Sequence, residues 1–238
     1  MSRFGRSPSA CLTVVSVAAL CWISISTGCH KNGARSDELI EAASRGDAAK
    51  VQALLKADPS LISSKDSHGN TPLHFAVLHG RLDVAELLLA SGADVNARKN
   101  NGDTPLHYAA YANPKAAAAL LLSHGADVNS KADEGVTPLY NAAGRNSTDV
   151  AELLLAKKAD VDVKTTRGFT PLHMAASRGN KAMAELLLAH GAKINAISKE
   201  GATPLHLAAK QNRQEMAEFL HSSGGLDPPV SQREWPYP

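Results

Sequence analysis

Aromatic side chains are scarce in this chain, because Phe, Trp and Tyr together make up only 4% of its 238 residues. A core with so few large rings has to be assembled mainly from Ala and Leu. Such a core suits thin helical layers that stack closely, and it argues against a sandwich of two sheets. The composition therefore favours a fold built from helices.

A strong excess of either charge is also missing. The formal net charge is +2, from 25 basic and 23 acidic side chains. Without Arg3 and Arg6, which lie in an N-terminal segment that we expect to be removed, 23 basic side chains match the 23 acidic ones. Because nucleic-acid binding usually requires a basic face, we expect no DNA or RNA partner.

The short motifs that accompany catalysis are absent as well. The sequence contains no Gly-x-Ser-x-Gly, no His-Glu-x-x-His, no Walker-type phosphate loop and no dinucleotide fingerprint. Repeats account for almost all of residues 37–225, which leaves no room for a separate catalytic domain. We therefore expect a protein without enzyme activity, without catalytic residues and without a cofactor.

The N-terminal segment differs in composition from the rest of the chain. Arg3 and Arg6 precede an uncharged, mostly apolar run over residues 10–25, as in a secretory signal peptide. This run is short for a membrane-spanning helix, and an uncleaved anchor extended by flanking residues is the alternative. Because Cys11 and Cys21 lie in this segment, an exported chain would keep only Cys29 and could form no internal disulfide.

The main feature of the remaining sequence is a tetrapeptide that recurs every 33 residues. Thr-Pro-Leu-His begins at Thr71, Thr104, Thr170 and Thr203, and the variant Thr-Pro-Leu-Tyr begins at Thr137. A unit of this length cannot bury its own apolar face, so neighbouring units must stack. The periodicity therefore predicts a solenoid.

Each unit carries the signals of two short helices. In the first unit Thr71 can cap a helix that begins at Pro72, and Gly80 can adopt the left-handed conformation that ends it. A second helix is expected from Leu82 to Ala90, because apolar residues recur there at helical spacing. The turn-rich residues 99–102 then form a projecting finger before the next threonine.

The residues that end these helices follow a rule with one exception. The first helix is followed by a residue that tolerates the left-handed region in all five units: Gly80, Asn113, Asn146, Gly179 and Asn212. The second helix is followed by glycine at positions 92, 125 and 191, whereas the third full unit has Lys158 there. We expect this lysine to cost about 1 kcal/mol if the backbone stays left-handed.

This pattern resembles the ankyrin repeat family. The five copies also share a glycine two residues before each threonine and a leucine pair in most second helices. The resemblance implies an all-α ankyrin-repeat solenoid of helix-turn-helix units with β-turn fingers, over residues 37–226. Its parts are a capping repeat over 37–70, full repeats that begin at 71, 104, 137 and 170, and a C-terminal capping repeat over 203–226. The Pro-rich tail over 227–238 cannot continue the helices.

The end of the N-terminal segment resembles the cleavage box of bacterial lipoproteins, in the residues Ile25-Ser26-Thr27-Gly28-Cys29. The resemblance implies a signal peptide over 1–28, a lipid on Cys29 and a tether over 29–36. Ser26 departs from the Leu, Val or Ile that the family prefers three residues before the cysteine. Ordinary signal cleavage or an uncleaved anchor therefore stays an alternative.

Ten histidines invite a metal hypothesis, but their positions favour a structural role. In the family that the chain resembles, the imidazole of the Thr-Pro-Leu-His motif hydrogen-bonds the threonine and nearby backbone, which applies to His74, His107, His173 and His206. Tyr140 occupies the same slot in the third repeat. His68 and His79 are the pair nearest the expected binding face, and because no Cys or carboxylate cluster joins them, we expect no metal site.

The resemblance also implies a recognition surface on the concave face, formed by finger tips and exposed positions of the first helices. Leu78, Tyr111 and Phe169 are the expected anchors, because exposed aromatic residues and arginines are favoured in interfaces, although scattered exposed apolar residues are also normal. The full set is Ser67, His68, Asn70, Leu78, His79, Asn100, Asn101, Asp103, Tyr111, Asp133, Glu134, Val136, Arg145, Thr166, Arg167, Phe169, Arg178, Lys199, Glu200, Lys210 and Gln211.

The sequence thus predicts a monomeric, non-enzymatic protein-interaction scaffold. We expect it to be exported and anchored by its N-terminal lipid, or by its signal, to the periplasmic side of a bacterial envelope. One alternative is a secreted, unanchored effector that binds a host protein. Another is an accessory inhibitor or chaperone of an envelope enzyme.

Overall fold

The computed structural model describes residues 33–226. The predictions for the signal peptide over 1–28, for Cys29 and for the tail over 227–238 lie outside this range. By its contacts the chain divides into residues 1–35 and residues 36–238, and the second unit contains the repeats. Within the described range the regular structure is helical, without strands. The predicted all-α class is therefore confirmed.

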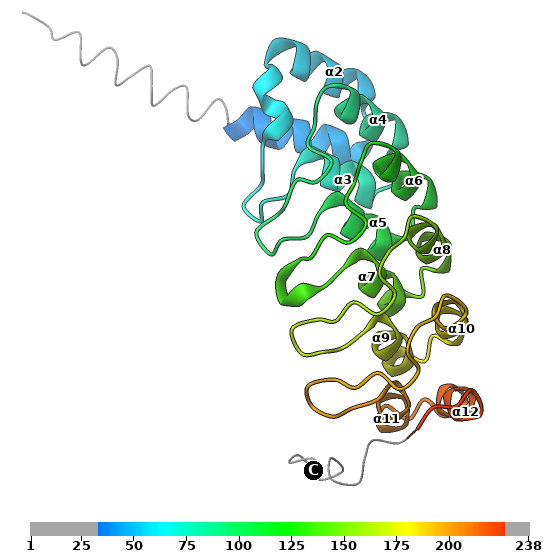
Figure 1. Ribbon diagram of the computed structural model, residues 1–238. Helices are drawn as coiled ribbons and strands as arrows, with labels where there is room; N and C mark the ends of the chain where they lie inside the picture. Colours follow the sequence, from blue (N-terminus) through cyan, green and yellow to red (C-terminus); the bar gives the residue numbers. More distant parts are fainter. Residues whose placement is uncertain (1–32, 227–238) are drawn as a thin grey trace, which may run out of the picture. The chain divides into compact units, whose positions relative to one another are not determined.

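The helices come in pairs (Figure 1). In every Thr-Pro-Leu unit the first helix begins at the motif proline, as predicted. The first helices are α3 Pro72–Leu78, α5 Pro105–Ala112, α7 Pro138–Arg145, α9 Pro171–Arg178 and α11 Pro204–Lys210. The second helices are α4 Leu82–Ala90, α6 Lys115–Ser123, α8 Thr148–Ala156, α10 Lys181–Ala189 and α12 Gln214–Ser222.

Two rows of helices stack in chain order within this unit. Each first helix contacts the next first helix from α3 to α11, and the second helices do the same from α4 to α12. Leucines at one register position of the second helices are fully buried between the rows, namely Leu88, Leu121, Leu154, Leu187 and Leu220. Alanines such as Ala109 and Ala142 let the first helices approach closely. The repeat solenoid predicted from the 33-residue period is thus confirmed.

The left-handed helix ends are also as predicted. The residues that follow the first helices have φ angles between 54° and 77°: Gly80, Asn113, Asn146, Gly179 and Asn212. Lys158 has φ 65°, so its backbone keeps the conformation that glycine adopts at the equivalent positions 92, 125 and 191. The third full repeat therefore holds a lysine in a conformation that is unfavourable for a side chain with Cβ.

The chain before Thr71 forms a helix pair of a different design. It comprises a helix over residues 33–45, then α2 (Ala48–Ala57) and the short 3-10 helix η1 (Pro59–Ser63). Leu39 and Val51 are fully buried in the core. Residues 33–36, the second half of the predicted tether over 29–36, are helical.

The fingers between successive repeats are joined tip to tip. A backbone N–H of each tip donates to a carbonyl of the preceding tip, in the pairs Asn100 to His68, Asp133 to Asn101, Thr166 to Glu134 and Lys199 to Arg167 (2.7–3.0 Å). A short 3-10 turn, η2 (Asp133–Gly135), forms one of these tips. The fingers therefore form a bonded series that holds neighbouring repeats in register.

Candidate functional site

The motif histidines connect each first helix to the finger of the next repeat. The backbone N–H of Thr71 donates to Nδ1 of His74 (3.1 Å), so Nδ1 is the acceptor, and Nε2 carries the hydrogen that it donates to the carbonyl of Asp103 (3.2 Å). His107 and His173 make the same two contacts, with Val136 and Ala202 as their carbonyl partners. The structural role predicted for these three imidazoles is confirmed.

Burial sets the ionisation of these three side chains. It lowers the pKa of His74 to about 4, and it also lowers the pKa of His107 and that of His173. The neutral form is favoured because a proton on Nδ1 would remove the acceptor for the threonine N–H and place a charge in the core. These histidines therefore serve as fixed connectors at neutral pH.

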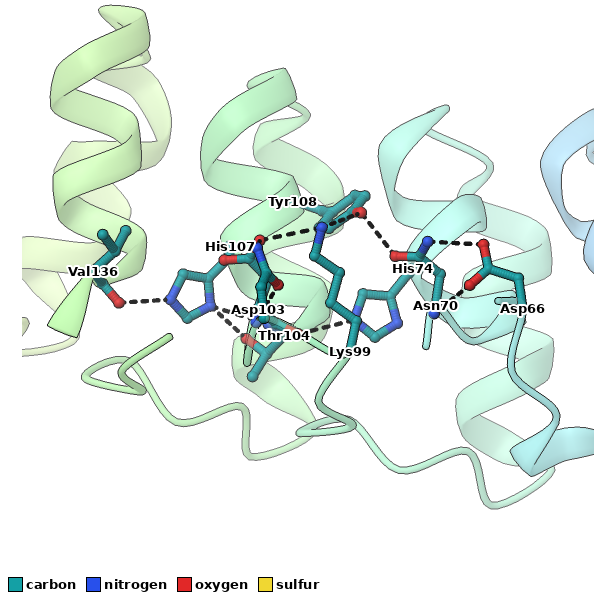
Figure 2. A network of polar contacts seen from close by, with 10 residues as sticks. Asp66, Asn70, His74, Lys99, Asp103, Thr104, His107, Tyr108 and Val136 are labelled. Atoms are coloured by element: carbon teal, nitrogen blue, oxygen red, sulfur yellow. Dashed lines mark hydrogen bonds and ion pairs between the residues drawn. The ribbon is translucent and has the colours of Figure 1, made fainter. Parts of the chain in front are cut away.

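A polar network joins the first two full repeats around Tyr108 (Figure 2). The Tyr108 hydroxyl donates to Oδ1 of Asn70 (2.7 Å) and accepts from Nζ of Lys99 (3.1 Å). Lys99 also lies 3.4 Å from Oδ2 of Asp103, and Asn70 is held by two hydrogen bonds to Asp66. The Tyr108 ring packs edge-on against His74, with ring centroids 5.3 Å apart. Each side chain of this network makes at least one polar contact within it, so together they form a wall of side chains held in place.

This wall borders the first of two adjoining hollows on the first-helix row. The first hollow has a volume of about 240 Å³ and is lined by Leu78, Lys99, Asp103, His107, Tyr108, Tyr111 and Asn141. The second has a volume of about 220 Å³ and is lined by Tyr111, Tyr140, Asn141, Gly144, Arg145, Met174 and Arg178. Because Tyr111 and Asn141 line both, the hollows form one continuous surface, which we call the first-helix groove.

Tyr111 lies at the centre of the groove. Its side chain is 50% exposed, and the Arg145 guanidinium covers its ring at 3.7 Å from the centroid. Burial raises the pKa of Tyr140, which lines the second hollow. An exposed aromatic ring flanked by arginines and by polar groups is the kind of surface that anchors a protein partner.

The structure gives the predicted binding residues several different environments. Leu78, Asp103, Tyr111, Arg145 and Arg178 come together in the first-helix groove. At the finger tips the side chains of Ser67, His68, Asn100, Asn101, Asp133, Glu134, Thr166, Arg167 and Lys199 are exposed. His79, Lys210 and Gln211 are exposed at the ends of α3 and α11.

One predicted contact residue is buried rather than exposed, and others are half-buried or already engaged. Asn70 is only 7% exposed, because its amide is held by Asp66 and Tyr108. Phe169, one of the expected anchors, is half-buried, with its ring centroid 5.6 Å from that of His173. Val136 is half-buried and offers its carbonyl to His107, while Glu200 pairs with Arg167.

Several groove residues were missed by the sequence analysis. Tyr108, Asn141 and Met174 lie one helical turn before residues that were predicted, Tyr140 lies five residues before Arg145, and Lys99 lies four residues before Asp103. Since residues three or four apart share a helix face, extending each predicted position back by one turn would have found Tyr108, Asn141 and Met174. The role of Lys99 depends on the fold, because its contacts with Tyr108 form only after the finger folds back on α5.

Neither a metal site nor a membrane span is found in the described part of the chain. Over residues 33–226 no group of three or more His, Cys, Asp or Glu side chains could hold a metal ion. Over the same residues no helix combines the length and apolar character needed to cross a bilayer.

Comparison with known proteins gives similarity to one family along most of the chain. The family model described as ankyrin repeats (3 copies) matches residues 17–99, 39–132, 92–165 and 139–231. Shorter stretches resemble curated proteins. The serine/threonine-protein kinase VIK of Arabidopsis thaliana is 44% identical over 55 residues, which are 23% of this chain and 13% of the kinase.

Two other relatives match segments of similar length. The ankyrin repeat domain-containing protein 13C-A of Xenopus laevis is 46% identical over 50 residues (21% of this chain, 9% of that protein). The 2-5A-dependent ribonuclease of Mus musculus is 44% identical over 52 residues (22% of this chain, 7% of that protein). The matched stretches thus span less than a seventh of each of these relatives.

Proposed function

Because the chain belongs to the ankyrin repeat family, we propose that it is a non-enzymatic scaffold that binds another protein through its first-helix groove and the adjoining finger tips. Proteins of this family generally act by binding other proteins. The observation that carries the proposal is the groove itself, which places the half-exposed ring of Tyr111 between two hollows. The bonded fingers and the three connecting histidines hold the repeats in register, so binding would require only limited ordering of the scaffold.

The proposal is tested by in-cell crosslinking followed by capture through the repeats. Tyr111→Ala removes the central ring of the groove and should abolish the captured partner. Leu82→Ala is the matched control, because Leu82 is an exposed large apolar residue (39%) on the second-helix row. Equal capture by both variants would show that the partner binds elsewhere.

We also propose that the protein is exported and tethered to a bacterial envelope, on the periplasmic side, as a monomer. This part is supported by the sequence of residues 1–29, with its basic start, its apolar run and Cys29 after two small residues. A diacylglycerol on the cysteine with a further acyl chain would anchor stably, whereas a single acyl chain binds only marginally.

The anchoring proposal has its own test, independent of the groove. Cells fed labelled fatty acid should label the native chain, and the Cys29→Ala variant should carry no label and leave the membrane fraction. Labelling that persists in Cys29→Ala would refute the lipoprotein assignment. A native chain that is processed, unlabelled and found in the medium would favour the secreted, unanchored form.

A further inference from the structure

We propose that the first-helix groove selects a protein segment in which an acidic side chain lies next to an apolar one. The carboxylate would lie between Arg145 and Arg178 in the second hollow, and the apolar side chain would lie against Leu78 and Tyr111 in the first. This inference rests on the proposed protein-binding function and specifies the chemistry of the ligand.

The first line of evidence is the state of the two arginines. Both guanidinium groups are exposed and line the second hollow, and within residues 33–226 neither forms an ion pair or a hydrogen bond. By contrast, nearby Arg167 is already paired with Glu200. Arg145 lies over the Tyr111 ring, with its guanidinium carbon 3.7 Å from the ring centroid, and this contact does not use the N–H groups as hydrogen-bond donors. Guanidinium groups match carboxylates with paired hydrogen bonds.

The second line of evidence is a glycine that opens the hollow between them. Residues at 33-residue intervals from Leu78 are Tyr111, Gly144, Ser177 and Lys210, so only the third unit has no side chain at this position. Gly144 lies inside α7, where glycine costs about 0.5–1 kcal/mol relative to alanine. A Cβ at this position would come within 3.2 Å of Met174 Cγ. The hollow therefore exists because a destabilising residue occupies the helix.

The polar groups around the two hollows point to the same ligand. No Asp or Glu lines the second hollow, whereas Tyr140 and Asn141 add a hydroxyl and an amide that can donate. Burial raises the pKa of Tyr140, and the charge of Glu134 on a finger tip adds to this effect, whereas the charges of Arg167 and Arg178 oppose it. In the first hollow the charges of Lys99 and Asp103 satisfy each other at 3.4 Å, so Leu78 and the Tyr111 ring are left to contact an apolar side chain.

The experiment is a selection from a random-peptide display library on the full-length protein, followed by affinity measurement of the selected peptides. We expect peptides enriched in Asp or Glu beside a large apolar residue. Replacing that acid by its amide should weaken binding about tenfold, as should Arg178→Gln or Arg145→Gln. The loss should be non-additive when the peptide and Arg178 are changed together, because both changes remove one contact.

Two further variants make the result specific. Lys157→Gln removes one positive charge from the second-helix side, as each arginine variant removes one from the groove, and it should leave affinity unchanged. Gly144→Leu retains both arginines but fills the hollow, and it should weaken binding at least as much as Arg178→Gln. Thermal melting of each variant checks that it is folded.

The failures of the two proposals are distinguishable. Selected peptides that lose binding in Tyr111→Ala but show no acidic enrichment, or bind Arg145→Gln and Arg178→Gln normally, would overturn the carboxylate inference and leave groove binding intact. Peptides that bind Tyr111→Ala and Gly144→Leu as well as the native chain would overturn both. A library that yields no binder would also count against both.

Discussion

At the scale of single residues, backbone conformation rather than contact decides the identity of the residues that follow each helix. Lys158 has φ 65°, in the region where glycine is found at positions 92, 125 and 191. An L-residue in this region is less favourable than glycine by about 1–2 kcal/mol, partly offset by the larger unfolded-state entropy of glycine.

We therefore expect Lys158→Gly to raise the free energy of unfolding by about 0.5–1 kcal/mol and to raise the melting temperature. Thermal melting and urea unfolding measure both. Gly191→Lys is the reverse control, because Gly191 has φ 86° and no neighbouring atom within 4 Å of an added Cβ. It should lower stability by a similar amount. A fall in stability for Lys158→Gly would mean that the lysine makes a compensating interaction.

Residues of this kind could be predicted from the sequence because the constraint is local. The left-handed positions from Gly80 to Asn212 were identified from residue type and spacing alone. The burial of Asn70 could not be, because it depends on the hydroxyl of Tyr108, which is 38 residues away in the chain. Sequence reasoning thus finds conformational requirements more readily than contacts between repeats.

At the scale of elements, each first helix is joined to the following finger by an imidazole. A histidine whose folded pKa lies below its unfolded value of about 6.5 binds fewer protons in the folded state. Its contribution to stability is therefore complete above pH 6.5 and is lost as the pH falls towards the folded pKa, which is about 4 for His74.

We expect the free energy of unfolding to fall between pH 6.5 and pH 4, on the order of 3 kcal/mol for His74 alone. Urea unfolding across this range measures the slope. His74→Gln should be less stable at pH 7 and should show a shallower slope. Burial alone would raise the pKa of Asp66, but hydrogen bonds with Asn70 and His68 outweigh it and lower the pKa. The stability that Asp66 contributes is therefore lost only as the pH falls below 3.8. An unchanged slope in His74→Gln would contradict this account.

At the scale of the whole repeat domain, stability is shared between neighbouring layers. Each repeat contacts the repeats before and after it, so a change in a central layer affects two interfaces and a change in the last layer only one. Leu154 and Leu220 occupy the same register position and are both fully buried, in α8 and α12.

Leu154→Ala should lower the global unfolding free energy by about 2–5 kcal/mol, whereas Leu220→Ala should mainly loosen the last helix pair. Amide hydrogen exchange, read by segment, separates the two outcomes. In Leu220→Ala exchange should rise over residues 203–226 and stay near native over residues 71–156. A uniform rise in both variants would show that the domain unfolds as one cooperative unit.

The stacking of layers was predictable from the 33-residue period because every unit repeats the same apolar positions. The groove was only partly predictable, since it arises where the repeats differ. The groove depends on contacts between side chains of different repeats. Arg145 covers Tyr111, Lys99 binds Tyr108, and Gly144 leaves space beside Met174 that a larger side chain would fill. Periodicity describes what the repeats have in common, and recognition depends on their differences.

The third full repeat has Tyr140 where three others have a connecting imidazole. The carbonyl of Phe169, which corresponds to that of Asp103, Val136 and Ala202, accepts from the backbone of its own finger, and the described residues include no side-chain donor to it. This joint lacks one bond worth about 1 kcal/mol, and the second hollow extends across it from α7 to α9. Changing the spacing between Arg145 and Arg178 therefore costs less free energy than changing the spacing across a joint that a histidine bridges. A bound segment would therefore set the angle between α7 and α9.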